Sequence, residues 1–118
     1  MPNINFSMNW SELKDLKKGR EITTIRWIDK YDYYNSFMNV NFNIRLKYPN
    51  KWKVLGKAIL KSVEKRYIDT FDPSEIKADT FEHYTVDDFF MLLAKFYGRK
   101  DNWKGKQSEV ILLRFEVL

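Results

Sequence analysis

The sequence contains no cysteine and only one histidine, His83, and each shortage excludes a class of function. Without cysteine there is no disulfide framework, no zinc–thiolate site and no cysteine nucleophile. With one histidine there is no multi-histidine metal site, and we predict no metal or other cofactor. No apolar run approaches the roughly 18 residues that span a membrane. The first ten residues also lack the basic segment and apolar core of a secretory signal, so we expect a cytoplasmic protein without membrane association.

Aromatic residues, in contrast, are abundant. They make up 17% of the 118 residues, and hydrophobic residues as a whole make up 44%. This composition favours a packed core over disorder. The length supports one domain, residues 1–118.

The net charge of +5 is distributed unevenly along the chain. Residues 45–66 hold eight Lys or Arg against one Glu, a net of +7, whereas residues 67–90 hold one Lys against seven Asp or Glu, a net of −6. A block this basic is a candidate surface for phosphate, and a solvated strand face is the simpler alternative. The acidic block argues for one basic face or groove rather than a protein that is basic on all sides.

The periodicity of apolar residues predicts an α+β fold. Strands are expected at 21–28, 39–48 and 108–118, with one or two more within 52–68. Helices are expected at 9–19, 72–79 and 85–98, the last with Thr85 as its N-cap and Asp88 in a capping box, and residues 31–37 are expected to form a loop or hairpin edge. Five to six strands with two to three short helices, and no βαβ rhythm, indicate a small, partly closed mixed barrel.

Three segments together resemble a known family. A helix followed by glycine, a basic residue and then Thr and Arg is present as Gly19, Arg20, Thr24 and Arg26; "LGKAILKSV" and "VILLRFEVL" resemble later strands, and "ADTFEHYTVDDFFMLLAKFY" an acidic residue before a capped helix. This ordered set resembles the ASCH domain, a branch of the PUA-like fold. The resemblance implies a PUA-like β-barrel that binds RNA or modified nucleosides in a cleft beside the barrel.

A catalytic branch of that family removes acyl groups from acylated cytidine, using a lysine, a threonine and a glutamate. The corresponding positions here are Glu21, Thr24 and Glu82, so the lysine is replaced by a residue of opposite charge. This departure argues against the branch chemistry, because an activated nucleophile needs a base with a tunable pKa. Glu21 and Glu82 could instead form a carboxylate pair for acid/base hydrolysis or for a metal ion, and both readings stay open.

The same resemblance predicts a ligand-binding set, which consists of Arg20, Thr24, Arg26 and Glu82. The guanidinium of Arg26 would grip a phosphate or carboxylate. The alternative for Arg26 is an internal ion pair with Glu82 or with an acidic loop residue.

Aromatic and basic residues predict a nucleic-acid surface, because flat rings stack on unpaired bases and cations neutralise phosphates. The predicted contact residues are Trp27, Lys47, Lys51, Trp52, Lys53, Lys57 and Lys61. Ordinary packing under loops is the alternative for the rings. A second group of aromatic residues at core spacing is predicted to be buried: Phe42, Phe89, Phe90, Phe96 and Phe115.

Three functions follow from these observations. The favoured one is a module that binds RNA, another single-stranded nucleic acid or a nucleotide. The second is a small hydrolase, either a nucleoside amidohydrolase or a ribonuclease, with Glu21, Thr24 and Glu82 as catalytic residues. The third is a non-catalytic domain that binds a protein partner or a second copy of itself.

Overall fold

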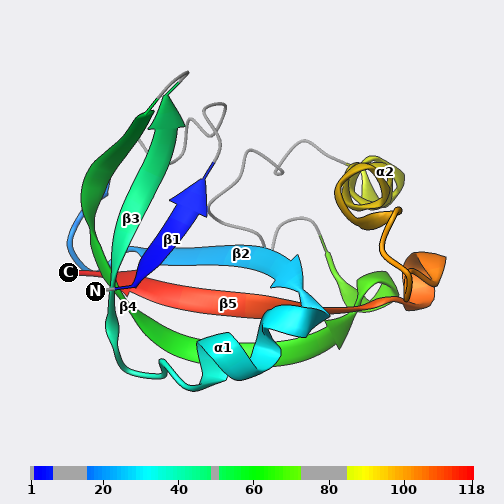
Figure 1. Ribbon diagram of the computed structural model, residues 1–118, viewed down its shortest axis with the longest axis horizontal. Coiled ribbons are helices and arrows are strands. Elements are labelled where there is room, and N and C mark those ends of the chain that lie inside the picture. The colour runs from blue at the N-terminus through cyan, green and yellow to red at the C-terminus, as the bar shows by residue number, and fades with distance from the viewer. Residues whose placement is uncertain (1, 7–15, 49–50, 73–84) are drawn as a thin grey trace.

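A computed structural model describes residues 2–6, 16–48, 51–72 and 85–118 of the chain. The protein is α+β and is built around one curled five-stranded sheet with the strand order β1-β3-β4-β5-β2 (Figure 1). The strands are β1 (Asn3–Phe6), β2 (Glu21–Trp27), β3 (Asn41–Tyr48), β4 (Lys51–Tyr67) and β5 (Glu109–Val117). The helices are α1 (Tyr31–Asn35) and α2 (Val86–Tyr97), with single 3₁₀ turns at Ile28–Lys30, Ile68–Thr70 and Gly105–Gln107.

Strand β4 gives the sheet its curl. Its 17 residues pair with β3 over the first half and with β5 over the second half. The pairing register shifts twice along β4. In the β3–β4 ladder the shift lies opposite Ile44 and Arg45 of β3, and in the β4–β5 ladder it lies between Leu60 and Ser62 of β4. Such irregularities bend a strand and increase its twist. In Figure 1, β4 accordingly curves from the β3 side of the sheet round to the β2–β5 side.

Strand β5 lies between β4 and β2, and it is buried on both faces because a hydrophobic core packs on each side of the sheet. The side chains from Val110 to Leu113 are fully buried, as the continuous apolar run predicts for a central strand. Alternate side chains of β5 therefore enter two separate hydrophobic cores.

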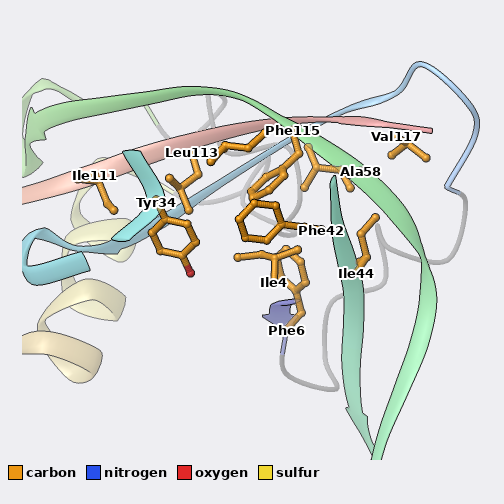
Figure 2. Close-up of a cluster of buried hydrophobic side chains, with 12 residues drawn as sticks. Ile4, Phe6, Tyr34, Phe42, Ile44, Ala58, Ile111, Leu113, Phe115 and Val117 are labelled. Carbon is orange, nitrogen blue, oxygen red and sulfur yellow. The ribbon is translucent and has the colours of Figure 1, made fainter. Parts of the chain in front are cut away.

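The larger core fills the concave side of the sheet. Figure 2 shows side chains of β5, among them Leu113 and Phe115, pointing toward Phe42 of β3 and Ile4 of β1, with Tyr34 of α1 beside them. The rings of Phe42 and Phe115 meet edge to face at 5.2 Å between centroids. Contacts of this kind add to the stabilisation that comes from burying the rings.

The smaller core lies on the opposite face, under α2. Phe89 and Leu93 of α2 pack there with Leu112 of β5 and Ile25 of β2. The N-terminus of α2 has the predicted capping box: the Asp88 amide donates to Thr85 Oγ1 at 3.1 Å, and the Thr85 amide donates to Asp88 Oδ2 at 3.3 Å. These bonds satisfy main-chain donors that the helix itself leaves unpaired.

Several expectations need correction. Residues 31–35 form the helix α1 rather than a loop, because Tyr34 is buried in the larger core. Strand β1 was not predicted; it is only four residues long and is held by parallel pairing with β3. Phe96, expected in the core, is 57% exposed, since α2 turns its buried face elsewhere.

The region 52–68, predicted to hold one or two strands, forms the single strand β4. The predicted helix at 72–79 and most of the one at 9–19 lie outside the described residues. Within the part of the chain that the structure describes, no helix is both long and apolar enough to cross a membrane.

Candidate nucleic-acid interface

The outer face of β1, β3 and the first half of β4 is polar and basic. Alternation along β3 sends Phe42 and Ile44 into the larger core and the residues between them to the outside. Residues that pair across a ladder share a face, so the register extends this surface onto β1 and β4. We call it the β1–β3–β4 face, and it consists of Asn3, Asn5, Asn41, Asn43, Arg45, Lys47, Trp52, Val54 and Lys57.

No Asp or Glu occurs between residues 33 and 63, so this face carries no carboxylate from its own strands. The neighbouring part of the outer face is different, because its charges are paired. Arg114 of β5 lies 3.3 Å from Glu21 and 3.9 Å from Glu64, and Lys61 lies 3.6 Å from Glu116. The cations of the β1–β3–β4 face, in contrast, lie on strand segments that bear no carboxylate of their own.

Trp52 is the most prominent aromatic side chain of this face and is 44% exposed. The guanidinium carbon of Arg45 lies 4.7 Å from the centroid of its ring, and the Lys47 ammonium lies at 5.9 Å. Arg45 is held in turn by Asn5 of β1, whose Oδ1 accepts a 2.8 Å hydrogen bond from Arg45 Nε. Three adjacent strands thus place an exposed indole among cations.

The predicted lysines divide between the two sides of the β3–β4 hairpin. Lys47 and Lys57 lie on the β1–β3–β4 face with Trp52. Lys51 and Lys53 alternate to the other side of the hairpin, where Lys53 pairs with Leu46. All four are exposed, and an open depression between Lys51, Trp52, Lys53 and Val54 lies on the hairpin.

Thr24 and Arg26, the strongest match to the family motif, lie side by side on the concave face of β2. Arg26 Nη1 donates to Thr24 Oγ1 at 2.7 Å and to the Ile25 carbonyl at 2.8 Å. Arg26 Nη2 donates to the Asn5 carbonyl at 2.8 Å, and the guanidinium also lies 5.4 Å from the centroid of the Phe6 ring. These partners are neutral oxygens and a ring. Glu82, the partner named for the alternative ion pair, lies outside the described residues.

Tyr34 completes this buried polar cluster. Burial raises the pKa of the Tyr34 phenol, and the positive charge of Arg26 opposes the increase. The side chain is only 8% exposed, so the phenol stays neutral at physiological pH.

Glu21, the residue at the position of the family lysine, lies on the opposite face from Thr24. It pairs with Glu116 in the β2–β5 ladder and its carboxylate contacts Arg114 at 3.3 Å. An odd number of steps separates Glu21 from Thr24, and strand alternation therefore directs the two side chains apart. Glu82 and His83 lie outside the described residues, and Arg20 is half-buried just before β2.

The assignment of Trp27 to the nucleic-acid surface is wrong. Its side chain is 4% exposed, and its ring stacks on Tyr97 of α2 at 5.1 Å between centroids. The polar residues that surround Trp27 in the sequence suggested exposure, but α2 covers the ring. A base has no access to it in this structure.

Sequence reasoning also missed two residues of the interface. Arg45 was counted in the basic block but was not selected as a contact, and Asn5 was not considered. A signal for Arg45 was present, since it alternates with the buried Ile44 in β3. Asn5 had none, because its role depends on the pairing of β1 with β3.

In comparisons with known proteins, no family model, no curated protein and no solved structure matches the chain. Among the described residues, no group of three or more Asp, Glu, His or Cys could hold a metal ion. A function is therefore inferred from the geometry of the β1–β3–β4 face.

Proposed function

We propose that the protein binds nucleic acid, and single-stranded RNA in particular, on the β1–β3–β4 face. The observation that carries this proposal is the exposed Trp52 ring beside Arg45 and Lys47, in a stretch of chain, residues 33–63, that has no carboxylate. Cations at this density attract phosphates, and the ring supplies a surface on which a base can stack.

An unpaired strand fits this face better than a duplex. Base stacking on an aromatic ring contributes about 1–3 kcal/mol and needs a base whose own face is accessible. Amide groups farther along the same face, such as that of Asn41, are suited to hydrogen bonding with base edges. The outer face of a sheet offers both types of contact to a strand that lies flat on it.

The hydrolase alternative has weaker support. It uses Thr24 and Glu82, with Glu21 as a third candidate. Thr24 and Glu21 lie on opposite faces of β2, and Glu82 lies outside the described residues. The Arg26 guanidinium is also engaged with main-chain oxygens. Binding without catalysis is therefore the function that we propose.

We further propose that the curled sheet is a PUA-like barrel of the ASCH type. Support comes from the turn at Gly19, which has a φ of +85°, and from Thr24 and Arg26 on one face of the strand that follows. An experimental structure would test this assignment by superposition on PUA-like domains. A different strand order in the region that closes the barrel would contradict it.

Titration with a single-stranded RNA of uniform sequence tests the binding function. We expect the affinity to fall steeply between about 50 mM and about 200 mM salt as condensed counterions are released. Replacing Lys47 and Lys57 together by Gln should reduce the salt slope by about 1.4, since each phosphate contact to a single strand contributes about 0.7.

The matched control replaces Lys95 and Lys100 by Gln, because both are exposed and lie on or after α2, away from the β1–β3–β4 face. This variant should keep the wild-type slope. Absence of binding at low salt, or an affinity that does not depend on salt, would contradict the proposal.

A further inference from the structure

We propose that Asn5, Arg45 and Trp52 form a relay that holds the indole as a one-sided stacking platform for a single unpaired base. Arg45 is then a positioning residue rather than a phosphate contact. This inference rests on the proposed nucleic-acid function and specifies which group of the ligand is recognised, and by which surface.

The relay crosses three neighbouring strands. Asn5 of β1 is in register with Arg45 of β3, and Arg45 Nε donates to Asn5 Oδ1 at 2.8 Å. Because Nε is only a donor, this bond identifies the amide atom that faces Arg45 as the oxygen. The guanidinium held in this way lies 4.7 Å from the centroid of the Trp52 ring on β4.

A stacked guanidinium restricts the indole without burying it. The cation lies over one face of the ring, where it is attracted by the π electrons. Trp52 nevertheless stays 44% exposed, and Lys47 is farther away, at 5.9 Å, on a flexible side chain. The exposed part of the ring is therefore the surface that a ligand can cover.

Trp103 is an example, for comparison, of an indole that is packed against other aromatic rings. It lies 5.9 Å from Phe90 in a stacked arrangement and 6.3 Å from Trp27, so other rings occupy its surroundings. Among the described side chains, two cations lie over the Trp52 ring and no other ring pairs with it. A flat neutral group, such as a nucleobase, complements a ring that already has a cation on its other face.

The expected ligand group is an unpaired base. A base inside a duplex is stacked on both sides and has to leave the helix before it can cover an isolated ring. One ring with one accessible face accommodates one base. The surrounding cations then hold the phosphates on either side of that base.

The central test compares Arg45→Lys with Lys47→Gln in the RNA titration. Lysine keeps the charge at position 45 but lacks the Nε donor and the planar fork. We expect Arg45→Lys to lower the affinity several-fold with an unchanged salt slope. Lys47→Gln should instead reduce the slope by about 0.7, as the loss of a phosphate contact does.

A double-mutant cycle tests the relay itself. Trp52→Ala should weaken binding by roughly 5- to 150-fold, which corresponds to the loss of one stacked base. Asn5→Ala should weaken binding when Trp52 is present and have no further effect in Trp52→Ala, because Asn5 acts only through the ring. Trp52→Phe keeps a ring, should retain much of the affinity, and controls for folding together with circular dichroism of each variant.

The outcomes separate this inference from the proposed function. If Trp52→Ala binds as tightly as the wild type while salt dependence persists, the platform is wrong and the basic face stands. If Arg45→Lys reduces the salt slope, Arg45 contacts phosphate and the positioning role is wrong. Equal affinity for a duplex of the same sequence also overturns the platform, whereas no binding by the wild type at low salt overturns both proposals.

Discussion

Arg26 of β2 donates a hydrogen bond of 2.8 Å from Nη2 to the main-chain carbonyl of Asn5 in β1. These two strands are the edge strands of the five-stranded sheet. The contact therefore joins the two edges, which the curl of the sheet brings close together. The Phe6 ring, 5.4 Å from the guanidinium, lies in the same place. The residue that the family motif assigns to a ligand is thus also the residue that connects the two edges.

Removal of this connection should destabilise β1 first. Arg26→Met keeps much of the aliphatic stem but loses every guanidinium hydrogen bond, and we expect a loss of about 1.5–3 kcal/mol in the free energy of unfolding. Denaturant unfolding gives the magnitude. Hydrogen exchange should show faster exchange for amides of β1, with amides of β4 and β5 less affected.

Arg99→Met is a suitable control for that experiment, because Arg99 is exposed after α2. It should change the stability by less than about 0.5 kcal/mol. Unaltered exchange of the β1 amides in Arg26→Met would show that parallel pairing with β3 alone holds β1.

The raised pKa of Tyr34 predicts a loss of stability at alkaline pH. The folded state keeps the phenol proton more tightly than the unfolded state, whose tyrosine pKa is about 10. The stabilisation is therefore fully present below about pH 10 and is lost as the pH rises through the higher folded value.

Urea unfolding from about pH 8 to about pH 11.5 measures this effect. Tyr34→Phe has no proton to lose and should show a smaller alkaline decrease than the wild type. Tyr67→Phe serves as the control, because Tyr67 is 53% exposed, and this variant should retain the wild-type pH dependence. The same pH profile in all three proteins would count against the assignment.

The ion pair between Glu21 and Arg114 should contribute little to stability. Their side chains are 45% and 34% exposed, and exposed pairs of this kind are worth about 0–1 kcal/mol. Glu21→Gln should therefore unfold within about 1 kcal/mol of the wild type in a denaturant titration. A larger loss would mean that this part of the outer face is more shielded from solvent than its exposure indicates.

The cap of α2 gives a further prediction. Thr85→Ala removes the oxygen that accepts from the Asp88 amide and should cost about 0.5–2 kcal/mol of stability. Thr85→Ser keeps the oxygen and should restore most of the loss. Thermal unfolding of the two variants decides between a real cap and a contact with no energetic consequence, in which case both variants would behave alike.

Much of the sheet and the long helix could be predicted from local patterns. β2, β3 and β5 have β-branched, alternating or continuous apolar sequences, and α2 has both a cap and helical periodicity. β1 has the right alternation but only four residues, and its stability comes from pairing with a strand 40 positions away, as in Asn3 with Asn43. α1 depends on the burial of Tyr34, which composition does not reveal.

Charge is visible in the sequence while burial is not. The basic block lies on β3 and β4, but its lysines divide between the two sides of the hairpin; Trp52 is exposed, as the sequence suggested. Trp27 was misassigned because the helix that covers it lies about 70 positions later, at Tyr97. The role inferred for Arg45 also depends on distant pairing, since Asn5 reaches it only through the register of β1 and β3.

The central place of β5 has a consequence for how the chain acquires its structure during synthesis. The β3–β4 hairpin connects neighbouring segments and can form as soon as both have left the ribosome. β2 precedes that hairpin, yet its ladder partner is β5, which emerges after every other element, with Glu21 opposite Glu116. Until then, the apolar residues of β2 lack their backbone partner, and the growing chain exposes an unpaired strand that a chaperone or another copy could bind.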